Sequence, residues 1–230
     1  MRVAIMQPCF LPWAGYFHLA AKADQFVFLS DAQYQKNSWH NRNQILVSGA
    51  PHWITVPVKK DTLGQTIAET RLDQRSPWKK KLRQTIAQSY AKAAYLDDLY
   101  KLLDMLDAAP DKNLAALNKH LIKSICEQAG VAASFVESTD MQIDAKRTDK
   151  LLIILKKLGA KYYLSPLGAK DYLEVDDFTG RTEVALEYSR FKDHPYVQLK
   201  VSSYHEKLSV VDVIANIGFA KFEEYLKNEK

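Results

Sequence analysis

MRVAIMQPCFLPWAGYFHLAAKADQFVFLSDAQYQKNSWHNRNQI, residues 1–45, is the stretch that decides the fold class. An apolar run at residues 3–6 predicts a short buried strand, which Gln7, Pro8 and Pro12 end. Residues 16–23 have the apolar spacing of a helix, and residues 26–29 form a second apolar run. Strand, loop, helix and strand in this order predict a right-handed crossover between parallel strands. The fold class is therefore α/β, with a mostly parallel, Rossmann-like sheet flanked by helices.

The first two predicted strands are followed by polar side chains. Gln7 follows the first strand, and Asp31, Gln33 and Tyr34 follow the second. Open α/β sheets bind their ligands outside the carboxyl ends of the strands. We therefore expect Asp31 to take part in catalysis and Gln7, Gln33 and Tyr34 to bind substrate. Trp13, from the loop after the first strand, is expected to pack on a substrate ring.

The segment SWHNRNQI, residues 38–45, contains no aliphatic residue before its last position. Arginine offers a rigid fork for carboxylate or phosphate, asparagine both donates and accepts, and tryptophan offers a flat face. The segment therefore predicts a binding loop, with His40 as a catalytic candidate because imidazole titrates near neutral pH. Its substrate-binding candidates are Trp39, Asn41, Arg42 and Asn43. The alternative is a polar loop whose side chains cap nearby backbone groups.

The middle of the chain combines one strand with a helical segment. Alternation over residues 53–58 predicts a strand that delivers Lys59 and Lys60 as cations for phosphate or carboxylate. Ser76 and Pro77 begin one or two amphipathic helices, and a further helix begins near Asn113 and ends at Gly130. Residues 76–130 are thus a mainly helical segment or insertion within a single α/β domain of residues 1–230.

The later half returns to α/β alternation, with strands expected at 131–136, 161–164 and 184–188 and helices at 149–158 and 209–217. Polar clusters follow two of these strands. The turn SPLGAKDYL supplies the binding candidates Ser165, Gly168, Asp171 and Tyr172, although a turn that merely connects strand and helix explains its glycine as well. The loop after the last strand supplies His194 as a catalytic candidate, with Tyr196 and Gln198 as binding candidates.

Five blocks of sequence follow one another along nearly the whole chain: MQPCFLPWAGYFHLAAKADQFVFLSDAQYQKNSWHNRN, WITVPVKK, WKKKLRQTIAQSYAKAAYL, YYLSPLGAKDYL and HPYVQLKVSSYHEKLSVVDVIANIG. In combination they resemble the WbqC-like protein family. Its members are similar to proteins found with surface-polysaccharide and O-antigen (lipopolysaccharide) biosynthesis genes, and a glycine or other aminoacyl transferase role has been proposed for some. The turn at Gly168 is poorer in glycine than the family pattern, because Leu167 and Ala169 flank it, and Cys9 stands where an aromatic residue is common.

Composition limits the range of partners. The 230 residues are 47% hydrophobic and 26% charged, which is ordinary for a globular protein, and the net charge is +5. A modest basic excess fits an anionic small molecule or nucleotide-sugar, and no nucleic-acid-binding motif accompanies it. The two cysteines have no metal-ligand spacing, and neither a signal peptide nor a membrane-spanning run is present. We expect a cytoplasmic protein without a metal site or an integral membrane segment; the sequence leaves cofactor and oligomeric state open.

Together, the residues and the resemblance imply a transferase that attaches an aminoacyl, possibly glycyl, or acyl group to an amino sugar or nucleotide-sugar. One alternative is a glycan-binding or assembly protein without turnover. Another is an ATP-dependent amide-forming enzyme, because the opening unit is similar in order to those of nucleotidylyltransferases and pantothenate synthetase. Those enzymes bind ATP through a His-x-Gly-His turn, and residues 13–16 here read WAGY, without either histidine.

Overall fold

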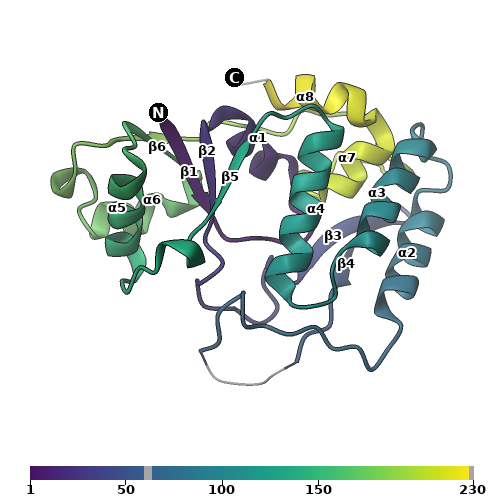
Figure 1. The fold of residues 1–230 in the computed structure, drawn as a ribbon. Helices are drawn as coiled ribbons and strands as arrows, with labels where there is room; N and C mark the ends of the chain where they lie inside the picture. Colours follow the sequence, from purple (N-terminus) through teal and green to yellow (C-terminus); the bar gives the residue numbers. More distant parts are fainter. Residues whose placement is uncertain (60–63, 228–230) are drawn as a thin grey trace.

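A computed structural model describes residues 1–59 and 64–227 of the chain. Five parallel strands form its main sheet in the order β5-β2-β1-β6-β7 (Figure 1). Their bounds are β1 (Arg2–Met6), β2 (Gln25–Phe28), β5 (Ser134–Glu137), β6 (Tyr162–Ser165) and β7 (Ala185–Tyr188). The predicted Rossmann-like α/β class is confirmed. The chain builds outward from β1 to β5 and then continues at β6 on the other side of β1, so the topological switch point lies between β1 and β6.

Helices cover both faces of this sheet (Figure 1). Ala4, Phe26 and Leu164 point to the face covered by α1 (Ala14–Lys22) and α4 (Leu114–Gln128). Val3 and Val27 point to the opposite face, covered by α5 (Arg147–Leu158) and α6 (Lys170–Val175). Alternate residues of each strand enter different cores because side chains alternate across a sheet. The strands are continuous apolar runs in the sequence because both faces of the sheet are buried.

A separate two-stranded hairpin, β3 (Arg42–Val47) and β4 (Ala50–Thr55), packs beside the helical part. Ser48 and Gly49 turn the chain with φ values of 52° and 84°, the left-handed conformations that a two-residue hairpin turn of type I′ requires. The predicted strand at 53–58 therefore begins earlier and ends at Thr55. The prediction of a loop over residues 38–45 is wrong from Arg42 onward, because β3 begins there. Asn43 is a polar residue in a buried position of this strand, so the sequence lacks the apolar alternation that would have predicted the strand.

The remaining helices follow the sequence pattern in most places. Residues 76–130 contain α2 (Trp78–Ser89), α3 (Leu96–Ala108) and α4, and the C-terminal part contains α7 (Val210–Ile217) and α8 (Phe219–Lys227). The expected cap at Asn113 is present, since its Oδ1 accepts from the Ala116 N–H at 2.8 Å. Pro77, rather than Ser76, precedes α2 and makes no side-chain cap. The short helices are η1 (Thr139–Met141), η2 (Leu167–Ala169) and η3 (Thr179–Arg181).

Within residues 1–59 and 64–227, no helix has both the length and the apolar character needed to cross a membrane.

Candidate functional site

Two neighbouring strands exchange hydrogen bonds at their carboxyl ends. Phe28 of β2 pairs with Glu137 of β5, so the residues that follow each strand lie side by side. Ser30 Oγ donates to Glu137 Oε2 at 3.1 Å, and Ser138 Oγ donates to Asp31 Oδ1 at 2.6 Å. Each strand end therefore supplies one carboxylate and one hydroxyl, and each hydroxyl holds the carboxylate of the other strand.

Two lysines complete this arrangement from opposite faces of the sheet. Lys119 of α4 lies 2.8 Å from Glu137 Oε1, and Lys150 of α5 lies 2.6 Å from Asp31 Oδ2. The four charged side chains are between 12% and 24% exposed, so the charges are shielded but accessible. We call this set the carboxylate–lysine cluster; its members are Ser30, Asp31, Lys119, Glu137, Ser138 and Lys150.

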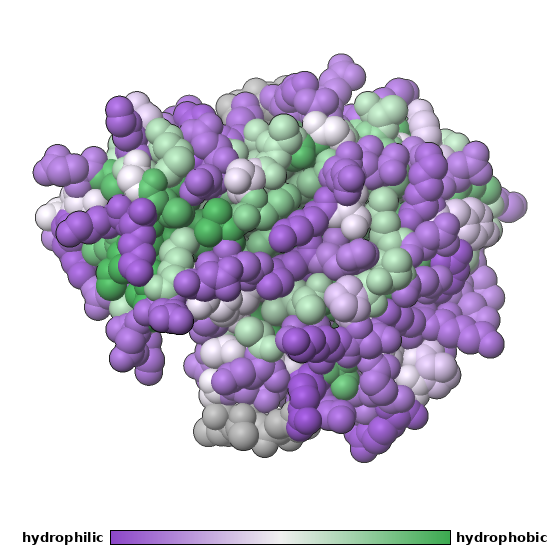
Figure 2. Space-filling view, in the orientation of Figure 1, coloured by the Kyte–Doolittle hydropathy of each residue, from purple (hydrophilic) through white to green (hydrophobic). Residues whose placement is uncertain are grey.

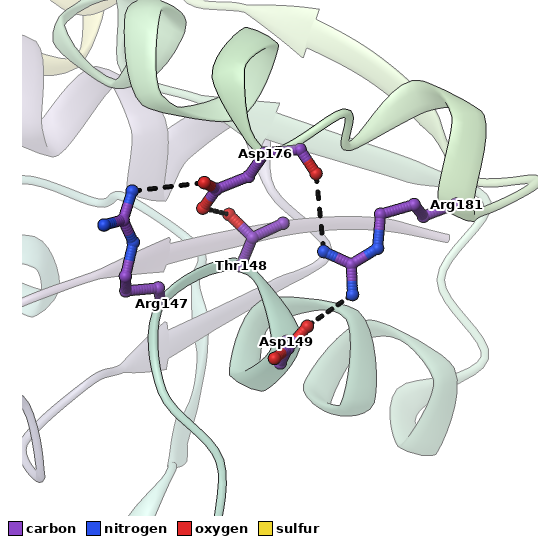
Figure 3. A network of polar contacts seen from close by, with 5 residues as sticks. All are labelled: Arg147, Thr148, Asp149, Asp176 and Arg181. Atoms are coloured by element: carbon purple, nitrogen blue, oxygen red, sulfur yellow. Dashed lines mark hydrogen bonds and ion pairs between the residues drawn. The ribbon is translucent and has the colours of Figure 1, made fainter.

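The first turn of α5, which carries Lys150, is fixed by a separate polar network (Figure 3). Thr148 Oγ1 donates to Asp176 Oδ2 at 2.6 Å, and Arg147 contacts the same carboxylate at 3.1 Å. Arg181 of η3 pairs with Asp149 and reaches the Asp176 backbone oxygen. These contacts tie the start of α5 to the end of α6 and to η3. They hold the helix end from which Lys150 reaches the sheet.

Gln7 and His40 meet next to the end of β1. The Gln35 N–H donates to His40 Nδ1 at 3.3 Å, so Nδ1 is an acceptor and the ring proton is on Nε2. His40 Nε2 then donates to Gln7 Oε1 at 2.8 Å, which directs the Gln7 amide N–H groups away from the ring. Burial lowers the pKa of His40 from 6.5 to about 4. At neutral pH the imidazole is uncharged and both of its nitrogens have protein partners.

The two asparagines next to His40 bind backbone groups. Asn43 Nδ2 donates to the carbonyls of Phe10 and Leu11, and Asn41 Nδ2 donates to the Val56 carbonyl. Both side chains are buried. In the described structure Asn43 thus ties the loop after β1 to the hairpin, and Asn41 ties the residue before β3 to the residue after β4. Both act as in the capping alternative that the sequence left open.

Three further binding candidates lie near His40 in the chain: Tyr34, Trp39 and Arg42. The Tyr34 ring is 6.0 Å from the His40 ring, and burial raises the Tyr34 pKa while the nearby Arg42 charge lowers it. Trp39 and Arg42 face Trp53 of β4, which the sequence analysis did not single out. Gln33 is exposed and its backbone forms a bridge with Thr66.

Of the two cations after β4, Lys59 is exposed, and its backbone N–H donates to Arg71 O. Lys60 lies outside the described residues.

The loop after β7 turns toward α7 and α8. Tyr196 Oη donates to Asp212 Oδ2 at 2.6 Å, and Gln198 Nε2 donates to the same oxygen at 3.0 Å. Tyr90 Oη donates to Asp212 Oδ1 at 2.8 Å. The His194 ring packs against Tyr225 of α8, with 5.8 Å between centroids. We call Tyr90, Tyr196, Gln198 and Asp212 the Asp212 cluster. In this cluster Tyr196 and Gln198 donate their hydrogen bonds to another protein side chain.

The remaining candidates are spread around the end of β6 and the start of α1. Ser165 is buried and donates to the Pro166 carbonyl at 3.3 Å. Gly168 lies in η2 with open space where a Cβ would be, and Asp171 and Tyr172 are exposed at the start of α6. Trp13 packs edge-on against Phe191 at 5.7 Å.

Five of the six members of the carboxylate–lysine cluster were not among the sequence candidates, namely Ser30, Lys119, Glu137, Ser138 and Lys150. Glu137 and Ser138 follow a predicted strand, and the same strand-end rule that selected Gln7 would have found them. Lys119 and Lys150 carry no signal, because each is one lysine among several on an amphipathic helix.

Both cysteines are free thiols. Burial raises the pKa of Cys9 and of Cys126 to about 12, so both are protonated thiols at neutral pH. Within the part of the chain that the structure describes, no group of three or more His, Cys, Asp or Glu side chains is placed to hold a metal ion.

The surface is notched below α5, on the side to which β1 and β2 point (Figures 1 and 2).

Comparison with known proteins found one family and one relative that match nearly the whole chain. The model of the WbqC-like protein family matches residues 7–224. A protein of Mycobacterium tuberculosis strain H37Rv, the uncharacterized protein Rv1507c, is 31% identical over 230 residues, covering 98% of this chain and 97% of that protein. No solved structure matches the chain. A family match over most of the chain, together with a full-length relative, shows that this protein belongs to the WbqC-like protein family.

Proposed function

We propose that the protein is a transferase of O-antigen or related glycan biosynthesis, which attaches an aminoacyl or acyl group to the amine of an amino sugar or nucleotide-sugar. The observation that carries this proposal is the carboxylate–lysine cluster at the carboxyl end of the sheet, where the neighbouring strand β1 ends before Gln7. Its paired carboxylates and lysines complement a substrate that has both an amine and an anionic group. The resemblance to proteins found with glycan biosynthesis genes supports the substrate class.

Acyl transfer to an amine requires few groups. The amine nitrogen attacks the acyl carbon of the donor, the C–N bond forms, and the bond to the leaving group breaks with its electron pair. The nitrogen loses one proton, which Asp31 or Glu137 accepts, and the leaving group takes up a proton. The Gln7 amide is positioned to donate to the acyl oxygen as negative charge develops there.

In this proposal His40 is a positioning residue. Its Nε2–H holds Gln7 Oε1, and its other nitrogen is occupied by the Gln35 N–H, so the ring orients the amide. The proposal assigns no acyl intermediate to Cys9, because burial raises the pKa of its thiol and so disfavours the thiolate nucleophile. Direct transfer from the donor to the amine, through positioning and charge stabilisation, is therefore the simplest scheme.

The test is product formation. The purified protein is incubated with nucleotide-linked amino sugars and a panel of aminoacyl and acyl donors, with and without ATP, and products are detected by mass. We expect a mass increase that equals one aminoacyl or acyl group. Removing the base in Asp31→Asn and Glu137→Gln should lower the rate by about a hundredfold in whichever variant loses the proton acceptor.

A matched control is Asp104→Asn. Asp104 also pairs with a cation, Arg83 at 2.9 Å, but its side chain is 70% exposed on α3. We expect this variant to retain the wild-type rate. Equal losses in Asp104→Asn and in the cluster variants would refute the assignment of the site.

A binding protein without turnover is the second candidate. It is favoured by the engagement of both His40 nitrogens and of all four oxygens of Asp31 and Glu137. Saturable binding of a nucleotide-linked amino sugar with no product across the complete donor panel would establish it in place of the transferase.

A further inference from the structure

Two exposed tryptophans and one arginine lie together on the hairpin and on the segment that precedes it. Trp39 and Trp53 are 50% and 39% exposed, and their ring centroids lie 5.3 Å apart with the planes tilted by 43°. The Arg42 guanidinium carbon lies 4.1 Å from the centre of the Trp53 ring. We call Trp39, Arg42 and Trp53 the tryptophan platform.

The hairpin register produces this arrangement. Arg42 pairs with Thr55 and Gln44 pairs with Trp53, so Arg42 and Trp53 are diagonal neighbours on one face of the two strands. The opposite face carries Asn43, Ile45 and Ile54, which are buried. The core therefore occupies one face, and the platform stands on the other.

Arg42 has unused hydrogen-bonding capacity. Its Nε is buried and has no hydrogen-bond partner among the described residues. Arginines elsewhere pair with carboxylates, namely Arg2, Arg75, Arg83, Arg147 and Arg181. In the described structure Arg42 instead lies on the Trp53 face and no carboxylate pairs with it, so its guanidinium charge is not neutralised and can attract an anionic group of a ligand.

The platform is too small for a protein partner. An indole side chain buries about 150–250 Å². Two half-exposed indoles therefore offer about 200 Å², whereas a stable protein interface needs about 800 Å² on each side. The tilt of 43° also prevents the two rings from forming a parallel slot for a flat base. Two inclined faces instead suit the puckered C–H surface of a sugar ring, whose polarised hydrogens meet the negative faces of the indoles.

The platform is also next to the proposed active site. Trp39 precedes His40 in the chain and His40 holds Gln7. The Tyr34 ring lies 6.0 Å from the His40 ring, and the Arg42 charge is near enough to lower the Tyr34 pKa. We propose that Trp39, Trp53 and Arg42 bind a pyranose ring that carries a phosphoryl or carboxylate group. The sugar ring stacks on the two indoles, and its anionic group pairs with Arg42. This inference rests on the proposed function for placing a sugar at this site.

The experiment measures binding without turnover. Acrylamide quenching of tryptophan fluorescence and titration calorimetry are carried out with glucose 1-phosphate, glucuronic acid, methyl glucoside and uridine monophosphate. Trp78 is buried and Trp13 is only partly exposed, so Trp39 and Trp53 are the rings most accessible to the quencher. We expect protection by glucose 1-phosphate or glucuronic acid, the stronger of the two identifying a phosphoryl or a carboxylate group as the anion.

Variants locate the binding. Trp39→Ala and Trp53→Ala should each weaken the binding of the anionic sugar about fivefold, as expected for one aromatic contact. Arg42→Lys should weaken it about tenfold, because the fork is lost, and leave methyl glucoside binding unchanged. The control is Tyr100→Ala, which removes another aromatic ring, 45% exposed on α3, and should change nothing. Trp53→Thr keeps a strand-forming residue, and it replaces Trp53→Ala if that variant does not fold.

Three outcomes would overturn the platform: no protection by either anionic sugar, equal weakening in Tyr100→Ala, or equally strong, tryptophan-dependent binding of uridine monophosphate. Product formation with unchanged sugar binding in Trp39→Ala and Trp53→Ala would overturn the platform and leave the transferase intact. Platform-dependent binding with no product from any donor would confirm the platform and refute the transferase.

Discussion

Asp31 and Asp212 both lie in polar clusters, but the two clusters keep a carboxyl group inside the protein in different ways. Asp31 is partly exposed and pairs with Lys150, while Ser138 donates to its other oxygen. Asp212 is fully buried and accepts from Tyr90, Tyr196 and Gln198, all neutral donors. Burial is the largest influence on Asp212 and raises its pKa.

The difference separates a site that can bind a ligand from one that holds the fold together. A carboxylate with a lysine partner at a partly open surface can exchange that partner for a group of a substrate. A carboxyl group surrounded by protein hydroxyls has no access to a substrate, and its donors are committed. Carboxylates of the same chemical type are thus a proposed ligand site at the carboxyl end of the sheet and a structural contact of α7 in the Asp212 cluster.

Asp212→Ala is expected to have the largest effect on stability. The substitution leaves Tyr90, Tyr196 and Gln198 without their acceptor in a buried place, which should lower the free energy of unfolding by about 4 kcal/mol. Asp31→Ala should lower it by about 1 kcal/mol, because the ion pair is partly hydrated. Urea denaturation measures both values.

Single-donor variants serve as controls for this comparison. Tyr90→Phe and Tyr196→Phe each remove one hydroxyl and should cost about 1 kcal/mol. If Asp31→Ala destabilised the protein as much as Asp212→Ala, the contrast between the two clusters would have no energetic basis.

His40 should give stability at neutral pH that is lost in acid. Its folded pKa, about 4, is below the ordinary 6.5, so between these values the unfolded chain binds more protons. Stability from this group is therefore complete above about pH 6.5 and declines as the pH falls toward 4, by up to about 3 kcal/mol. Denaturation of the wild type and of His40→Gln across this range measures the effect, because other titrations cancel in the difference.

The expected result is a wild-type advantage that shrinks as the pH falls. A difference that stayed constant would show that His40 titrates alike in the folded and unfolded chains. That outcome would remove the basis for a neutral imidazole that orients Gln7 at the ligand-binding end of the sheet.

The elements of this fold could be predicted because their signals are local. Asn113 caps its own helix, and Gly159 ends α5 with a φ of 63°, a conformation that glycine adopts readily. The mostly parallel sheet followed from the alternation of apolar runs with helices. The hairpin start at Arg42 was missed because Asn43 is a polar residue in a core position, held by the carbonyls of the loop after β1.

The candidate site was only partly predictable, because its decisive contacts join distant segments. Lys119 meets Glu137, and Lys150 meets Asp31, only after the helices on opposite faces have packed on the sheet. Tyr196 and Gln198 have the residue types of a binding loop, yet their donors go to Asp212, which lies in a later helix. The rule that ligands bind at the carboxyl ends of strands identifies one end of the sheet. It does not show which polar side chains at that end remain available to a ligand.

The smallest expected effect concerns how far the ligand-binding end of the sheet extends past β6. Gly168→Ala should change the free energy of unfolding by less than about 0.5 kcal/mol, because its φ is not left-handed and an added Cβ meets nothing within 4 Å. Gly49→Ala is the contrast: φ is 84° and the Cβ would overlap the Lys200 carbonyl, for a loss of about 2 kcal/mol. If the Gly168 turn approached a phosphate closely, the methyl group would weaken sugar-phosphate binding without affecting folding. Unchanged binding in calorimetry would instead confine the site to β1, β2 and β5, where Gln7, Asp31 and Glu137 lie.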